Sequence, residues 1–186
     1  MIYSVNLGRT GMLDIDKIKE IDTENPENQY GKIQFGGLWA SREGNTGWEE
    51  ICKREYPDWL SNENAKVTVK DNARILILDS EEKYEQILQT HGRPNTHRYY
   101  QNDPHFLLNY GALKKDYDII EFRVDDYPDL HRMLGGNNLE IDSVLIMNKD
   151  AIEKIENPPE ITMYDPRADF LKQYKNGIEV SQLPTT

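Results

Sequence analysis

The sequence has one cysteine, four histidines and no long apolar run. The single thiol, Cys52, cannot form an intramolecular disulfide, which fits a reducing compartment. No stretch approaches the roughly 18 consecutive apolar residues of a membrane-spanning helix, and the N-terminus has no basic segment followed by an apolar one. We therefore expect a cytoplasmic protein, in the producing cell or in a host cell, without a membrane partner.

Motifs of several common enzyme classes are also missing. Gly36-Gly37 is not followed by the Gly-Lys-Ser/Thr of a phosphate-binding loop, and neither G-x-G-x-x-G before a helix nor G-x-S-x-G occurs. The histidines show no metal-binding spacing and Cys52 offers them no partner, so we predict no metal site. Cys52 falls on the apolar side of a predicted helix, which favours packing over nucleophilic chemistry.

Basic residues are outnumbered in this chain. There are 22 lysines and arginines against 33 aspartates and glutamates, which gives a net charge of −11. Such a surface repels phosphate backbones, so a protein partner is favoured over a nucleic acid. The 186 residues suggest one domain, and an aromatic content of 10% argues against disorder.

Short strands and helices are predicted without regular β-α alternation, which favours an α+β fold over a doubly wound parallel sheet. Residue periodicity predicts strands over 2–6, 32–40, 67–69, 74–79, 118–124 and 141–147. Helices are predicted over 14–21, 46–60, 80–90, 104–115 and 128–134, with a polar loop over 91–103. Prolines after Glu156 predict an extended tail, so we divide the chain into a domain over 1–155 and a tail over 156–186 that packs on it.

The first candidate functional segment is the glycine-containing strand and the helix after it. The paired glycines allow another backbone or a ligand to approach closely, and Ser41 stands where the strand ends. A turn-rich loop then leads to a helix that begins near Trp48. Trp39 and Trp48 suit stacking on a planar ligand ring, and they equally suit core packing.

The second candidate segment is the acidic start of the last predicted strand. Glu140 and Asp142 are two positions apart, so in a strand they face the same side. Two carboxylates there suit stabilising a cationic, sugar-like transition state or binding ribose hydroxyls. On spacing alone, two exposed acids in a very acidic protein is the simpler interpretation.

These segments resemble, in the same order, small bacterial and phage proteins that are ADP-ribosyltransferase-like. The matching residues are those over 37–41, 47–52, 117–120 and 139–152. The resemblance implies a single domain with a split β-sandwich of ADP-ribosyltransferase type and peripheral helices. It also implies that NAD binds in the cleft between the two sheets.

The resemblance implies roles for individual residues as well. Members carry Arg or His on the first strand, Ser or Tyr on the second and Glu on a later one, which corresponds here to residues 3–6, Ser41 and Glu140. Glu140 would be the catalytic acid that stabilises charge as the nicotinamide–ribose bond breaks, and Ser41 would hold the ribose. Asp142 would be the neighbouring acid. The other cofactor-binding candidates are Tyr3, Asn6, Arg9, Trp39 and Trp48.

The implied activity is transfer of ADP-ribose from NAD to a macromolecular acceptor, as in a toxin, effector or phage modifier, with a cognate inhibitor as a further partner. The chain departs from the family pattern, since its nearest first-strand arginine is Arg9, beyond Gly8, and its acidic pair is Glu-x-Asp. Ala-Ser-Arg over 40–42 replaces Ser-Thr-Ser. The alternative is therefore an inactive ligand- or protein-binding domain on the same fold, such as an immunity, antitoxin-like or anti-defence protein.

Overall fold

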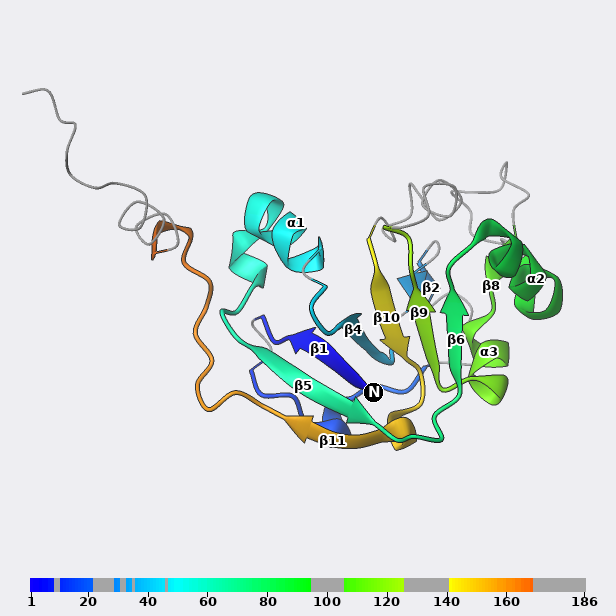
Figure 1. Ribbon diagram of the computed structural model, residues 1–186, viewed down its shortest axis with the longest axis horizontal. Coiled ribbons are helices and arrows are strands. Elements are labelled where there is room, and N and C mark those ends of the chain that lie inside the picture. The colour runs from blue at the N-terminus through cyan, green and yellow to red at the C-terminus, as the bar shows by residue number, and fades with distance from the viewer. Residues whose placement is uncertain are drawn as a thin grey trace, which may run out of the picture.

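The computed structural model describes residues 1–8, 11–21, 29–30, 33–34, 36–45, 47–94, 106–125 and 141–168. The strands of its main sheet are β1 (Ile2–Asn6), β4 (Leu38–Arg42), β5 (Asn64–Val69), β6 (Ile75–Leu78), β9 (Ile119–Phe122), β10 (Ser143–Ile146) and β11 (Ile152–Glu156). Their order across the sheet is β11-β5-β1-β4-β10-β9-β6 (Figure 1). Only β6 and β9 pair in parallel among these neighbours, so the described sheet is mixed.

The remaining described elements are few. The helices are α1 (Gly47–Glu55), α2 (Glu81–His91) and α3 (Tyr110–Asp116). Two small hairpins pair β2 (Gln29–Tyr30) with β3 (Ile33–Gln34), and β7 (Gly92–Pro94) with β8 (Phe106–Leu108). Within the described ranges, none of the helices has the length and apolar character required to span a bilayer. The described residues thus form a single mixed α/β domain with one large mixed sheet and few helices, which is compatible with the predicted α+β class.

β4 joins two halves of the sheet that run in different directions (Figure 1). Its first three residues pair with β10, and its last two pair with Tyr3 and Ser4 of β1. Apolar side chains of both halves meet in one buried cluster. Its members are Tyr3, Val5, Leu38, Val67, Val69, Ile119, Val144, Ile146 and Ile152.

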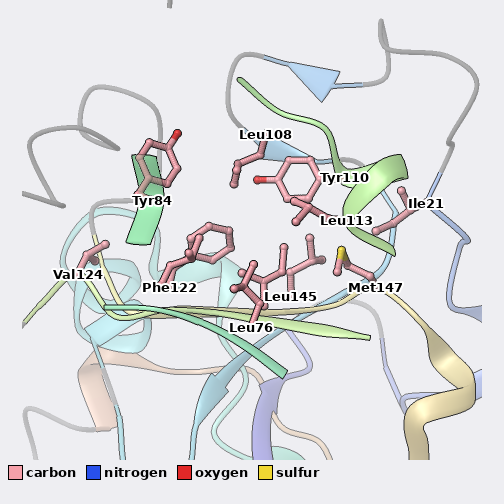
Figure 2. Close-up of a cluster of buried hydrophobic side chains, with 12 residues drawn as sticks. Ile21, Leu76, Tyr84, Leu108, Tyr110, Leu113, Phe122, Val124, Leu145 and Met147 are labelled. Carbon is pink, nitrogen blue, oxygen red and sulfur yellow. The ribbon is translucent and has the colours of Figure 1, made fainter. Parts of the chain in front are cut away.

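A second core lies between the other face of the sheet and helices α2 and α3. Leu76, Phe122 and Leu145 of the sheet face Tyr84 of α2 and Leu113 of α3 (Figure 2). Burying one large apolar side chain contributes about 1.5–3 kcal/mol. β9 is therefore buried on both faces, which explains why it reads as a nearly continuous apolar run.

The predicted strand over 32–40 is interrupted at its two glycines. Gly36 and Gly37 have φ values of +87° and +69°, which L side chains rarely adopt. A Cβ on Gly36 would lie 2.5 Å from the carbonyl oxygen of Glu20, and one on Gly37 would lie 2.8 Å from that of Ile146. The close backbone approach predicted from the sequence is correct, and it bends the chain into β4.

Three predicted helices differ from the observed ones. The helix predicted over 104–115 begins only at Tyr110, because β8 occupies the preceding residues and Asn109 caps the helix by accepting a bond from the Ala112 amide at 3.1 Å. Residues 14–21 form only a 3₁₀ turn at Ile15–Lys17. The helix predicted over 46–60 ends at Glu55, and a 3₁₀ turn follows at Pro57–Trp59.

The strand β11 was not predicted, and the chain beyond it packs on the domain. The Asn157 amide donates to the Leu13 carbonyl at 2.9 Å and accepts from the Leu13 amide at 2.7 Å. The Tyr164 amide donates to the carbonyl of Leu60 at 3.0 Å. The predicted helix over 128–134, most of the predicted 91–103 loop and the tail beyond 168 lie outside the described residues.

Asp118, just before β9, forms hydrogen bonds with Arg74 before β6 and with Asn148 after β10. Its carboxylate accepts bonds from the Arg74 amide at 2.9 Å, from the Arg74 guanidinium at 2.9 and 3.1 Å, and from the Asn148 side chain at 3.1 Å. The hydrogen bond from Arg74 is the main reason that the pKa of Asp118 falls to about 2. The ionised carboxylate therefore stabilises the approach of β6, β9 and the end of β10.

We predict that Asp118→Asn lowers the free energy of unfolding by about 1–3 kcal/mol at pH 7, the typical contribution of hydrogen bonds to a charged acceptor. The folded-state pKa lies below the unfolded value near 4, so this stabilisation is complete above about pH 4 and is lost as the pH falls towards 2. Urea unfolding at pH 7, 4 and 3 should show the difference shrinking. Asp71→Asn, at an exposed carboxylate, is the control. A difference that stays constant with pH would refute the role of the charge.

Candidate functional site

The two segments that carry the resemblance meet at one end of β4 and β10. β4 lies between β1 and β10, with Ser4 opposite Ser41 on one side and Val144 opposite Ala40 on the other. β4, which carries Ser41, therefore has β1 with Tyr3 on one side and β10, which follows Asp142, on the other. The sheet order thus brings together the three regions to which the resemblance assigns the site.

A buried carboxylate, Asp142, connects three chain segments at this place. It is 2% exposed, and it forms an ion pair with the guanidinium of Arg42 at the end of β4. It also accepts hydrogen bonds from the Asn45 amide group at 3.1 Å and from the backbone amide of Asp125 at 3.0 Å. Asp142 is therefore not the exposed acid of the simpler interpretation. Its oxygens already have partners within the chain, so its role is to position its neighbours.

Asn45 extends this connection to the start of α1. Its side-chain oxygen accepts a bond from the Gly47 amide at 2.9 Å, and its amide group donates to Asp142 and, at 3.4 Å, to Asp125. A Cβ on Gly47 would lie 3.7 Å from the Cβ of Ile141. The first turn of α1, which carries Trp48, thus lies against the residue that follows Glu140.

A second buried network links β1 to β9 beside the cluster that contains Tyr3 and Ile119, and no sequence pattern noted above predicted it. The Tyr3 hydroxyl donates to Glu121 at 2.7 Å, and the Arg123 guanidinium donates to the other carboxylate oxygen at 2.7 and 3.0 Å. Burial, together with the hydrogen bond to Glu121, raises the pKa of the Tyr3 phenol, so the hydroxyl remains a neutral donor. The signal in the sequence was a glutamate inside an otherwise apolar strand.

The two arginines are the partly exposed members of these networks. The side chains of Arg42 and Arg123 are 33% and 30% exposed, whereas those of their carboxylate partners are 2% and 1% exposed. Within the described part of the chain, the buried Nε of Arg42 has no hydrogen-bond acceptor. Guanidinium groups match phosphate oxygens in geometry and charge. These two side chains are therefore suited to an anionic ligand.

The remaining candidate residues have different surroundings. Ser41 is half-buried, and Trp39 packs against Phe122 with ring centroids 6.3 Å apart, which favours its core role. Trp48 is 42% exposed. The Asn6 amide group donates to the Ser61 carbonyl at 3.1 Å and its oxygen accepts from the Gly8 amide at 3.0 Å, so it ties loops together. Arg9 and Glu140 lie outside the described residues.

Cysteine and histidine take structural positions in the described chain. Cys52 is fully buried, and burial followed by the charges of Glu49 and Glu55 raises the pKa of its thiol, as expected for an unreactive packing residue. His91 contacts Thr90 and Asp116 through its two ring nitrogens, each at 2.8 Å. Among the residues with described positions, no group of three His, Cys, Asp or Glu side chains is arranged to hold a metal ion.

We predict that Arg42 and Asp142 are energetically coupled. Asp142→Asn should lower the free energy of unfolding by about 2–3 kcal/mol, because it leaves a half-buried guanidinium without its counter-charge. Arg42→Gln should have a similar effect, and the double variant should lose at least about 1 kcal/mol less than the sum. Urea unfolding of the four proteins measures this. Strictly additive losses would show that the two side chains act independently.

Comparison of the chain with protein-family models, with curated proteins and with solved structures found no match.

Proposed function

We propose that this chain is an ADP-ribosyltransferase-like protein that binds NAD where β1, β4 and β10 lie side by side and transfers ADP-ribose to a macromolecular acceptor. The observation that carries the proposal is the pairing of Asp142 with Arg42, which are 100 positions apart in the chain. This pair joins the two segments on which the resemblance depends. The strand order β1-β4-β10 adds support, since the three positions that the resemblance implies, residues 3–6, Ser41 and Glu140, belong to or directly precede these strands.

The proposed contribution of the chain is positioning and charge. Glu140, covalently tied two positions before Asp142, stabilises the positive charge that develops on the ribose as its bond to nicotinamide breaks. Ser41 holds the ribose. The partly exposed guanidinium groups of Arg42 and Arg123, whose charges are balanced by Asp142 and Glu121, donate hydrogen bonds to the diphosphate oxygens. Nicotinamide departs with the bonding electrons. A nucleophile of the acceptor then forms the new bond to the ribose carbon, or water does so and releases ADP-ribose.

An inactive binding domain on the same fold is the second candidate. The observation that favours it is that polar side chains at the site are hydrogen-bonded within the chain. Asn45 donates to Asp142, and Asn6 bonds to the backbone of Ser61 and Gly8. Such groups stabilise a rigid framework without taking part in chemistry. The two candidates differ in whether bound NAD is cleaved.

We predict that NAD raises the melting temperature of the wild-type protein and that the protein releases nicotinamide from NAD. Ligand at 100 times its Kd stabilises a protein by about 2.7 kcal/mol, which corresponds to about 5–10 °C for a domain of this size. Glu140→Gln should keep this rise and lose at least about 100-fold in nicotinamide release, because loss of one positioned electrostatic stabiliser typically has that effect. Ser41→Ala should weaken both.

Glu153→Gln is the matched control, since it makes the same change at an exposed position of β11, and it should behave as wild type. A wild-type protein that neither responds to NAD nor releases nicotinamide would contradict the proposed function. A rise in melting temperature without release would favour the inactive binding domain.

A further inference from the structure

Two aromatic rings stack on each other at the molecular surface, beyond the end of α1. The ring centroids of Tyr56 and Trp59 are 4.6 Å apart and their planes differ by 20°. The two residues are 45% and 55% exposed. Met163, which is 42% exposed, pairs with Ser61 two positions after Trp59. We call Tyr56, Trp59 and Met163 the aromatic surface.

The helix predicted over 46–60 would include Trp59, whereas α1 ends at Glu55. Pro57 ends the helix and starts the 3₁₀ turn, which turns the chain so that Leu60 is buried at 1% exposure and Trp59 faces outward. An exposed tryptophan stacked on an exposed tyrosine is therefore not part of the core. Tyrosine and tryptophan are the residues most enriched among the energetic anchors of protein interfaces.

The backbone beneath these rings is held on two sides. The Leu60 carbonyl accepts from the Tyr164 amide at 3.0 Å, and the Asn62 amide donates to the Thr162 carbonyl at 2.9 Å. On the other side, a Cβ on Gly8 would lie 2.5 Å from the carbonyl oxygen of Trp59, so the two backbones are in close contact. Because this backbone is already ordered, a partner that binds here has mainly to order the two side chains.

The charge of the chain segment that carries Tyr56 and Trp59 favours a basic partner. The stretch over 49–63 has two bases and five acids, the latter being Glu49, Glu50, Glu55, Asp58 and Glu63. Of the bases, Lys53 lies 5.5 Å from the ring centroid of Tyr164, and Arg54 pairs with Glu55 at 2.8 Å. Aromatic faces attract cations, and the net negative charge of this segment and of the whole chain, −11, favours a cationic partner over one that carries phosphate.

We propose that the aromatic surface docks a basic, arginine-rich segment of a partner protein, with guanidinium groups stacking on Tyr56 and Trp59. Arginine is the cation that pairs most often with aromatic rings, because its planar group both stacks and carries charge. Docking on this surface requires neither NAD nor the residues of the site at β4 and β10. A negative result for one function therefore leaves the other unaffected.

The test measures binding of an octaarginine peptide to the full chain by isothermal titration calorimetry at 150 and 500 mM NaCl. Trp59→Ala and Tyr56→Ala should each weaken binding about fivefold, and Trp59→Phe should weaken it less, because a phenyl ring keeps an aromatic face. Met12→Ala removes an exposed apolar side chain, 60% exposed, outside the aromatic surface and should change nothing. An octacitrulline peptide, of the same shape without the charge, should not bind.

Several outcomes would overturn the proposal. Equal affinities of the wild type and the two alanine variants would mean that bulk acidity alone attracts the peptide, and so would complete loss of binding at 500 mM NaCl. Failure of the wild type to bind octaarginine at about 100 μM would also refute it. A single-stranded oligothymidylate that binds the wild type but not Trp59→Ala would assign the surface to nucleic acid. A concentration-dependent dimer that Trp59→Ala abolishes would assign it to a second copy of the chain.

Discussion

The pairing of β4 with two different neighbours is the constraint on which the rest of the structure depends. Five residues serve both halves of the sheet, the first three against β10 and the last two against β1. The two halves run in different directions on either side of β4 (Figure 1), and both contribute side chains to the buried cluster that contains Tyr3, Val67 and Val144. Gly36 and Gly37 make the arrangement feasible, because the chain enters β4 past the carbonyl oxygens of Glu20 and Ile146 at distances that a Cβ would obstruct.

Buried charges then fix how the halves fit together. Burying an ion pair is not by itself strongly stabilising, since the desolvation of both groups offsets their attraction. Leaving one member unpaired is far more unfavourable, and this asymmetry penalises alternative registers. A one-residue slip of β10 would turn Asp142 to the opposite face of the sheet and separate it from Arg42. The hydrogen bond between Tyr3 of β1 and Glu121 of β9, 118 positions apart in the chain, likewise penalises a shift of either strand.

Local patterns predicted most strands of the main sheet but not which strands pair, and they missed β7 and β8, which lie in a predicted loop and a predicted helix. β1, β5, β6, β9 and β10 follow from alternation or from short apolar runs, which each segment carries within itself. β11 was not predicted because Glu153 and Lys154 interrupt its apolar pattern, and it forms a strand by pairing with β5. At the site, the sequence marked Asp142 as a candidate residue but not as a buried one, because its burial depends on an ion pair with Arg42, 100 positions away. The exposure of Trp59 does not follow from the helical pattern over 46–60, because the chain leaves the helix before Pro57 and Trp59 lies in a 3₁₀ turn.

Helix α1 links the proposed NAD site to the proposed docking surface. Its first turn is tied to Asp142 through Asn45, and the chain that leaves its last turn carries Tyr56 and Trp59. Nine helical residues span about 13 Å, so a protein held on the aromatic surface would lie roughly one helix length from the site. That distance is within reach of a side chain or loop of the docked partner. If both proposals hold, a partner docked on the aromatic surface would be near enough to the site to serve as the acceptor. A basic protein in that role agrees with the net charge of −11, which disfavours a nucleic acid.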